Sequence, residues 1–318
     1  MQHRDKILLY GSCFTEHIGG KMKEVKMQVI CNPNGILFNP MSIASCLTSA
    51  LEGKKYTEKD LFYTNETWNS WDFHSRFSHT DPDIALAAMN KAVQDAAGFL
   101  KQGQWLIITF GSAFQYFTTA KAGVADYGVA NCHKAPASWF YKKLLTVEEM
   151  YAKWAQLIEL LYQYNPALRL ILTVSPVRHI RDGLAENNRS KARLLELVHS
   201  LADTYERCWY FPAYELVMDV LRDYRFFEQD MVHPNSLAAQ YVWEQFVGTC
   251  MNRTDKPLLQ EIREITTAAR HRPRFPETAA AKQFRQTMLE KANALQRAYP
   301  YLDLSSELQH FTDEASPL

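Results

Sequence analysis

Residues 11–13 have the types and the spacing of a nucleophilic site. Gly11 ends an apolar run, and two possible nucleophiles, Ser12 and Cys13, follow it directly. A glycine permits an abrupt turn at the carboxyl end of a strand, and the helix that follows points its free N–H groups at the reacting atom. Such groups lower a thiol pKa and stabilise an oxyanion, so the segment is suited to acyl transfer. A turn without function is the alternative for a strand that ends in Gly-Ser.

A second segment, DMVHPN at Asp230–Asn235, supplies an acid–base pair. Asp230 stands three residues before His233, so one loop can deliver both groups. The carboxylate would orient one imidazole nitrogen while the other nitrogen faces a nucleophile. The alternative is a surface loop that only caps the helix expected over Leu237–Val247.

Further polar residues follow other expected strands and are candidates for substrate or oxyanion contacts. They are Asn32, Gly35, Gly111, Ser112, Gln115, Asn131, His133, Arg178 and His179. Gly35 can bring a bare N–H close to a ligand, and an arginine can bind a carboxylate or sugar hydroxyls. Each of these roles has a structural alternative. Gly35 could simply form a fixed turn, and each histidine could make a structural hydrogen bond. Arg178 could pair with Glu215.

The elements that must position these residues alternate along the chain. Apolar runs predict strands at Lys6–Tyr10, Lys26–Cys31, Trp105–Phe110, Leu168–Val174 and Cys208–Phe211. Helical periodicity lies between them at Ile84–Gln102, Val147–Asn165 and Ser190–Glu206. This alternation predicts a three-layer α/β/α, flavodoxin-like fold with a parallel sheet. Catalytic residues in such sheets lie beyond the carboxyl ends of the strands.

Two regions depart from this alternation. Ser49–Asp83 reads as an insertion, either a carbohydrate-stacking lid or aromatic packing onto the domain. Its candidate stacking residues are Trp68, Trp71, Phe73, His74 and Phe77. We expect one α/β domain over residues 1–254 and a helical C-terminal extension over 255–318, packed on the same domain. The extension includes a helix at Ala279–Ala298.

Composition limits the classes of partner. The chain has 318 residues with 35 basic and 35 acidic side chains, which gives no electrostatic case for nucleic acid or an anionic membrane. No apolar run reaches the roughly 20 residues that span a bilayer, and the start lacks the features of a signal peptide, so we expect a cytoplasmic protein. The six cysteines form no CxxC and have no zinc spacing, so we expect reduced thiols, no metal and no cofactor. The oligomeric state stays open.

The order of these segments resembles the SGNH (GDSL-type) hydrolase superfamily, which carries GDSxT, an oxyanion glycine, GxND and a late DxxH. The chain is similar in particular to the bacterial GSCFA-domain branch over roughly residues 6–250. The segments that carry this resemblance are GSCFT at 11–15, NPNGILFNP at 32–40, NCHK at 131–134, SPVRH at 175–179, and the stretch 210–235.

The resemblance implies an esterase that removes O-acyl groups from a carbohydrate or another small polar substrate. In register with GDSxT, Cys13 replaces the nucleophilic serine, and a shift by one residue would instead select Ser12. The third block lacks its asparagine and aspartate at Ala113 and Phe114. The oxyanion donor must then be the N–H of Gly35 or Cys13, or a side-chain amide. A non-catalytic glycan- or acyl-binding protein and a cysteine-dependent acyltransferase are the alternative functions.

Overall fold

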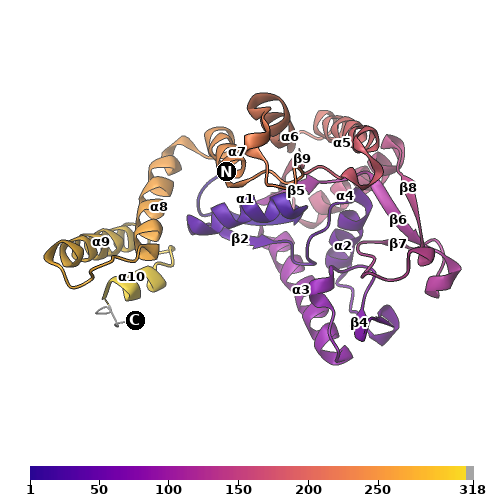
Figure 1. Cartoon of the computed structure of the whole chain (residues 1–318), viewed down its shortest axis with the longest axis horizontal. Coiled ribbons are helices and arrows are strands. Elements are labelled where there is room, and N and C mark those ends of the chain that lie inside the picture. Colours follow the sequence, from indigo (N-terminus) through magenta and orange to yellow (C-terminus); the bar gives the residue numbers. More distant parts are fainter. Residues whose placement is uncertain (313–318) are drawn as a thin grey trace. The chain divides into compact units, whose positions relative to one another are not determined.

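The computed structural model describes residues 1–312, and Figure 1 shows the chain coloured along its sequence. The chain divides into two compact units. The larger, α/β unit consists of residues 6–19 and 29–246, and the smaller unit consists of residues 1–5, 20–28 and the described residues from 247 to 312. None of the helices within residues 1–312 is both long and apolar enough to cross a lipid bilayer.

A five-stranded parallel sheet forms the centre of the α/β unit. Its strands are β1 (Lys6–Gly11), β2 (Gln28–Cys31), β5 (Trp105–Phe110), β9 (Arg169–Val174) and β10 (Cys208–Tyr210). They lie in the order β10-β9-β5-β1-β2, which is 2-1-3-4-5 by order of appearance, the arrangement of flavodoxin-like folds. The predicted fold class is therefore confirmed, and all five strands lie where the apolar runs predicted them.

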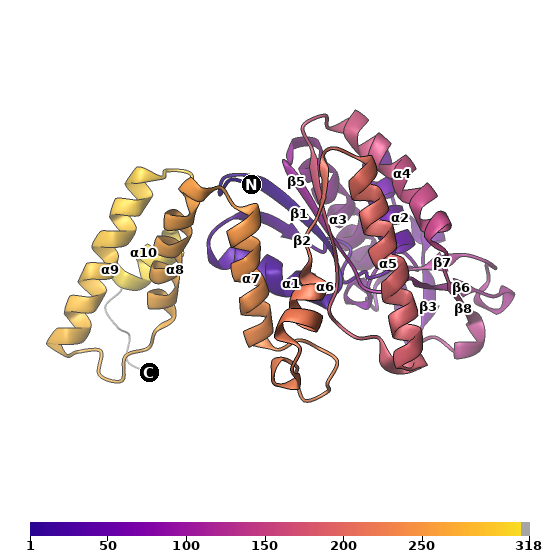
Figure 2. The same cartoon turned by 90° about the horizontal axis from the view of Figure 1, so that it is seen from above.

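Apolar strands and amphipathic helices create three layers. Every residue of β5 is buried, as expected for a strand covered on both faces. Helices α2 (Pro40–Glu52), α3 (Pro82–Gln102), α4 (Val147–Tyr164) and α5 (Leu184–Thr204) contribute to one apolar core on one face. Helices α1 (Cys13–Glu24) and α7 (Ser236–Cys250) lie on the opposite side in Figure 2.

Helix α2 begins inside the segment NPNGILFNP. The side chain of Asn39 accepts hydrogen bonds from the backbone N–H groups of Met41 and Ser42, and Pro40 occupies the first turn. Both residues are typical of a helix start, because the cap satisfies free N–H groups and proline has none to satisfy. The second Asn-Pro pair is therefore a helix start, and only the first belongs to the strand-end loop.

Antiparallel strands extend the α/β unit beyond the expected elements. A hairpin of β3 (Phe62–Thr64) and β4 (Thr67–Asn69) lies within the predicted insertion. A separate sheet contains β6 (Phe114–Thr118) between β7 (Gly128–Val129) and β8 (Phe140–Leu144). The ends of the predicted insertion belong to α2 and α3.

The smaller unit contains α8 (Lys256–Arg270), α9 (Ala279–Ala298) and α10 (Ser305–Thr312). The bounds of α9 are those predicted from the sequence. Two contacts join distant parts of the sequence in this unit: the amino group of Met1 donates to the carbonyl of Cys250 at 2.9 Å, and Lys26 pairs with Glu307 at 2.8 Å.

Candidate active site

Gly11 gives the first strand its abrupt end. Its φ is 151°, and a Cβ atom at this position would lie 2.4 Å from the carbonyl oxygen of Thr109 on β5. No side chain fits there, since real Cβ contacts are essentially never closer than 3.0 Å. The N–H of Gly11 donates to the side-chain oxygen of Asn32 at 2.8 Å, so the end of β1 and the loop after β2 are joined. The chain then enters α1 at Cys13.

Ser12 and Cys13 occupy different environments. Ser12 is 2 % exposed, and its hydroxyl donates to the hydroxyl of Ser175, at the end of β9, at 2.9 Å. Cys13 is the first residue of α1 and is partly exposed. A substrate carbonyl can therefore approach the Cys13 sulfur more readily than the Ser12 oxygen.

The Cys13 thiol has opposing electrostatic influences. Burial raises its pKa, whereas the backbone N–H groups of Phe14 and of Cys13 itself lower it. Glu16 adds a smaller raising effect and Lys191 a smaller lowering effect. Because burial dominates, the pKa lies above its ordinary value, and Cys13 is a thiol near neutral pH. Its reaction then requires a base.

Asp230 and His233 form the expected pair. The Nδ1 atom of His233 lies 2.6 Å from an Asp230 carboxylate oxygen. The other oxygen accepts the backbone N–H groups of Val232 and His233 at 2.8 and 3.0 Å. The backbone N–H and the ring of His233, followed by the N–H of Val232, lower the pKa of Asp230 to about 2. The carboxylate therefore stays ionised and holds Nδ1–H, which leaves Nε2 to accept a proton.

Arg178 connects the Asp230–His233 loop to the end of β9. Its backbone N–H donates to Val232 at 3.2 Å, and its guanidinium donates to the carbonyl of Met231 at 3.3 Å. The guanidinium also lies over the ring of Phe227 at 4.4 Å from the centroid. Glu215, the alternative partner considered for Arg178, instead accepts the Tyr210 hydroxyl, which lies 2.7 and 2.9 Å from its two carboxylate oxygens. In this structure Arg178 supports the loop.

His179 lies against the end of β5 with an unsatisfied nitrogen. Its Nε2 atom is buried without a hydrogen-bond partner within residues 1–312, and it would lie 3.3 Å from a Cβ atom on Gly111. Its backbone N–H donates to Asn187 on α5 at 2.8 Å. Burial, followed by the charges of Lys191, Lys142 and His233, lowers its pKa to about 3. His179 is therefore neutral near pH 7 and retains one N–H to donate.

The loop after β2 is held by internal contacts. Asn32 is fully buried, and its side-chain oxygen accepts the Gly11 N–H. The N–H of Gly35 donates to the Asn32 carbonyl at 2.8 Å and closes a turn. It is already engaged, so this geometry gives no support to Gly35 as an oxyanion donor. Its lack of a side chain instead permits close contact with His74, which would lie 2.1 Å from an added Cβ atom.

A Gly35→Ala substitution is expected to lower the free energy of unfolding by on the order of 2–4 kcal/mol. The φ of Gly35 is +88°, which strains any L side chain, and the contact with His74 adds a steric clash. The measurement is a denaturant or thermal unfolding curve. Gly53→Ala is the matched control, since Gly53 has a φ of +64° with nothing within 4 Å. Equal losses in the two variants would show that the contact with His74 contributes nothing.

Four other candidates have structural partners away from the ends of β1 and β9. Ser112 accepts the Phe114 N–H, and the amide of Gln115 donates to the carbonyls of Tyr116 and Val129. The Asn131 side chain accepts the His133 N–H. The Nε2 atom of His133 lies 2.8 Å from the Ser70 carbonyl, and burial lowers its pKa to about 4. These bonds organise the β6 sheet and join it to the insertion.

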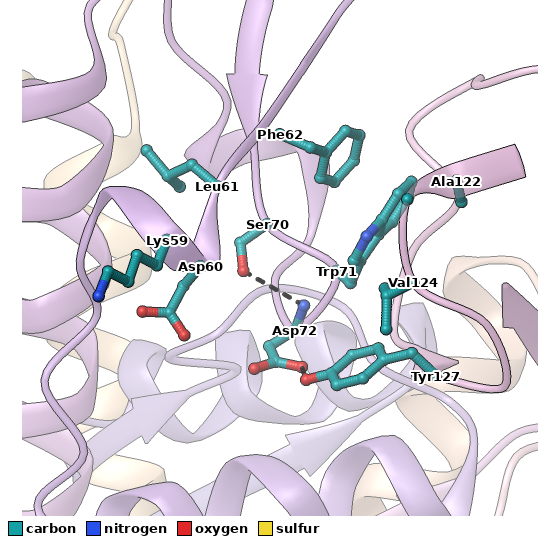
Figure 3. Close-up of a pocket in the computed structure, with 11 residues that line it drawn as sticks. Lys59, Asp60, Leu61, Phe62, Ser70, Trp71, Asp72, Ala122, Val124 and Tyr127 are labelled. Atoms are coloured by element: carbon teal, nitrogen blue, oxygen red, sulfur yellow. Dashed lines mark hydrogen bonds between the residues drawn. The ribbon is translucent and has the colours of Figure 1, made fainter. Parts of the chain in front are cut away.

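The aromatic insertion contains a pocket of about 390 Å³, shown in Figure 3. Phe62 and Trp71 stack along one side, with ring centroids 3.5 Å apart. Asp72 accepts the hydroxyl of Tyr127 at 2.6 Å and that of Tyr56 at 2.8 Å. The polar groups are largely paired with one another. Of the candidate stacking residues, Trp71 and Phe73 are buried, so these two rings pack within the α/β unit.

Lys191 is the residue that the sequence reasoning missed. It is 2 % exposed, and its amine donates to the carbonyls of Gly111 at 2.7 Å and Ser175 at 2.6 Å. A signal was present, because Lys191 lies on the same helix face as Leu194 and Val198, three and seven positions later. A lysine within the buried face of an amphipathic helix is unusual and indicates a candidate functional position.

The fold and these residues define a class: a flavodoxin-like α/β protein with a cysteine at the start of the helix after its first strand and an aspartate–histidine pair on a later loop. Within that class, the chain belongs to the GSCFA family, which it matches over residues 6–246. Residues 262–316 match the C-terminal domain of GSCFA domain proteins. No curated protein matches the chain.

Three solved structures have partial similarity to this chain. A carbohydrate esterase family 3 protein from Talaromyces cellulolyticus is 9% identical, with a TM-score of 0.36 over 82% of this chain and 99% of that chain. A mutant acetyl esterase with an acetate ion is 10% identical, with a TM-score of 0.37 over 82% and 99%. An acetyl xylan esterase from the rumen bacterium Butyrivibrio proteoclasticus is 12% identical, with a TM-score of 0.38 over 81% and 66%.

Proposed function

We propose that this protein hydrolyses ester bonds, with Cys13 as the nucleophile, His233 as the general base and Asp230 as the group that orients His233. The observation that carries the proposal is the Asp230–His233 contact of 2.6 Å. The loop that holds this pair accepts a hydrogen bond at the Val232 carbonyl from the N–H of Arg178, in the segment after β9. Ser175, in the same segment, accepts a hydrogen bond from Ser12, the neighbour of Cys13. The segment after β9 is thus linked by hydrogen bonds both to the loop of the Asp230–His233 pair and to the residue beside the nucleophile.

The proposed reaction has two steps. The Cys13 sulfur attacks the acyl carbon as its proton passes to Nε2 of His233, and the alcohol leaves with that proton. Water then attacks the thioester and gives a proton to His233, and the acid and the free thiol are restored. A base near the thiol is needed because burial raises the pKa of Cys13, so the thiolate is scarce at neutral pH.

His179 is the proposed oxyanion donor in place of the asparagine that the third block lacks. Its buried Nε2 atom has no other partner within residues 1–312, and it lies beside Gly111, which follows β5. The neutral ring can donate one hydrogen bond without a change of protonation. The backbone N–H of Cys13, at the start of α1, is a further proposed donor, whereas the Phe14 N–H already donates to the Ser12 hydroxyl at 3.3 Å.

The proposed substrate is an acyl ester of a carbohydrate or of another small polar alcohol. The exposed carboxylate of Glu16, on the same helix, acts on the Cys13 thiol, and the Arg76 guanidinium lies 3.9 Å from that carboxylate. The side chain of Arg76 also donates to the carbonyls of Asn32 and Pro33. A rim of charges favours a hydrated leaving group over an apolar one.

The test is to trap the acyl-enzyme. The protein is mixed with p-nitrophenyl acetate, quenched in acid within the first turnover, and digested for mass spectrometry. We expect a burst of p-nitrophenol, one acetyl group on the peptide that contains Cys13, and steady turnover afterwards. An acetyl group that stays until an amine or alcohol is added would indicate an acyltransferase. Neither acetylation nor turnover, together with saturable binding of a sugar, would indicate a binding protein.

A further inference from the structure

Lys191 joins the ends of two central strands from a fully buried position. The two carbonyls that accept its hydrogen bonds, those of Gly111 and Ser175, follow β5 and β9 directly. The Ser175 hydroxyl in turn accepts the hydroxyl of Ser12, which is adjacent to Cys13. Two hydrogen bonds therefore fix the amine of Lys191, and Ser175 and Ser12 link it to the residue that precedes the nucleophile.

The surroundings of this amine contain no permanent counter-charge. No carboxylate within residues 1–312 forms a salt bridge with Lys191, and its amine donates to two uncharged carbonyls. Burial accordingly lowers its pKa to about 7, and a Cys13 thiolate is the negative charge that raises it. Two other titratable groups face Lys191: the Tyr214 ring of α6 (Ala213–Glu215), 5.9 Å away, and the neutral His179.

We propose that Lys191 is a positioning residue whose buried amine supplies the positive charge that balances the Cys13 thiolate and so lowers the pH at which Cys13 reacts. A charge in this water-poor position acts strongly because solvent does not screen it. Glu16 opposes it from the exposed side of α1. The catalytic meaning of this inference rests on the proposed function, whereas the reactivity of Cys13 toward an alkylating agent does not.

The test is the pH dependence of Cys13 alkylation by iodoacetamide in the intact protein. The other five cysteines serve as internal standards in the same digest. We expect the midpoint for Cys13 to rise by about one pH unit or more in Lys191→Met, which is about a tenfold slower reaction at a fixed pH below the midpoint. Lys191→Arg, which keeps the charge, should restore most of the rate. An unchanged midpoint in folded Lys191→Met would overturn the proposal.

Ser190→Ala is the matched control for disturbance of α5. Ser190 is buried on the same helix and accepts the Ala113 N–H at 2.8 Å, but it carries no charge. Its loss should leave the Cys13 midpoint unchanged. A shift equal to that of Lys191→Met would mean that packing, and not charge, controls Cys13, and would also overturn the proposal.

A second measurement covers the case in which Lys191→Met does not fold. Lysine labelled with ¹³C at Cε reports the titration of Lys191 by NMR in the wild type and in Cys13→Ala. Linkage is reciprocal, so we expect Lys191 to titrate at lower pH once the thiolate is removed. Identical titrations would contradict the proposal. A coupled titration without ester hydrolysis would instead contradict only the proposed function.

Discussion

Replacing Cys13 by alanine is expected to reduce hydrolysis of p-nitrophenyl acetate by on the order of 10³-fold or more, because no other group in the proposed site can form the acyl-enzyme. Ser12→Ala is expected to retain most of the activity. The Ser12 hydroxyl is buried and already donates to Ser175, so an ester carbonyl has no open approach to it. The measurement is kcat/KM for both variants, compared with wild type under the same conditions.

Each of the two variants is a control for the other, because they change neighbouring residues and are expected to differ in stability and in activity. Ser12→Ala removes two buried hydrogen bonds, one donated to Ser175 and one accepted from the Phe14 N–H, and is expected to cost roughly 1–3 kcal/mol of unfolding free energy, with little effect on chemistry. Cys13→Ala should unfold close to the wild-type temperature. If Ser12→Ala loses activity while Cys13→Ala keeps it, the alignment shifted by one residue is correct and Ser12 is the nucleophile. If neither variant changes the rate, the proposed site is wrong.

The sequence alone could not choose between Ser12 and Cys13. Both are small, both follow the same strand, and either fits a turn after Gly11. The tertiary structure distinguishes them. Ser175 is 163 positions away from Ser12 in the sequence, and the parallel pairing of β9 beside β5 brings the two residues together. Residue type and local spacing could not predict that contact.

The strands were predictable because each is a short, continuous apolar run. Trp105–Phe110 is uniformly apolar apart from Thr109, and its bounds are those expected. The β6 sheet was missed for the opposite reason. Its strands Phe114–Thr118 and Phe140–Leu144 mix polar and apolar residues, and their pairing depends on contacts across about 25 positions. Helix α2 was missed because its start was read as part of a loop.

Arg178 shows how a correct position can have a different role. Its place after β9 marked it as a candidate for substrate binding, and the strand end is indeed beside the proposed site. Its hydrogen bonds nevertheless go to Met231 and Val232, and its charge lies over Phe227. The partners lie more than 45 positions further along the chain, so local sequence could not distinguish support of a catalytic loop from contact with a substrate.

His233→Ala is expected to reduce kcat/KM for p-nitrophenyl acetate by about 10²–10⁴-fold, the usual contribution of a general base. The pH profile should change as well. Burial raises the pKa of the Cys13 thiol above its ordinary value, so without His233 the residual rate depends on thiolate formed by solvent. That rate should climb about tenfold per pH unit through the alkaline range, whereas the wild type should not show this slope.

Two further substitutions distinguish the role of His233 as the base from the roles of Asp230 and His179. Asp230→Asn keeps the shape of the loop but removes the charge that holds Nδ1–H, and we expect an intermediate loss of rate. Since Asp230 has a pKa of about 2, its protonation should not limit wild-type activity at any pH above about 4. His179→Phe removes only the proposed oxyanion donor, so it should lower the rate by about 10²–10³-fold without the alkaline slope of His233→Ala.

The alkaline slope is therefore the decisive readout. A base and an oxyanion donor both lower the rate when removed, but only the loss of the base makes catalysis depend on the thiol's own ionisation. His233→Ala with a wild-type rate and profile would exclude His233 as the base. The same slope in His179→Phe would mean that His179, whose neutral Nε2 atom lies beside Gly111, takes the proton from Cys13 instead.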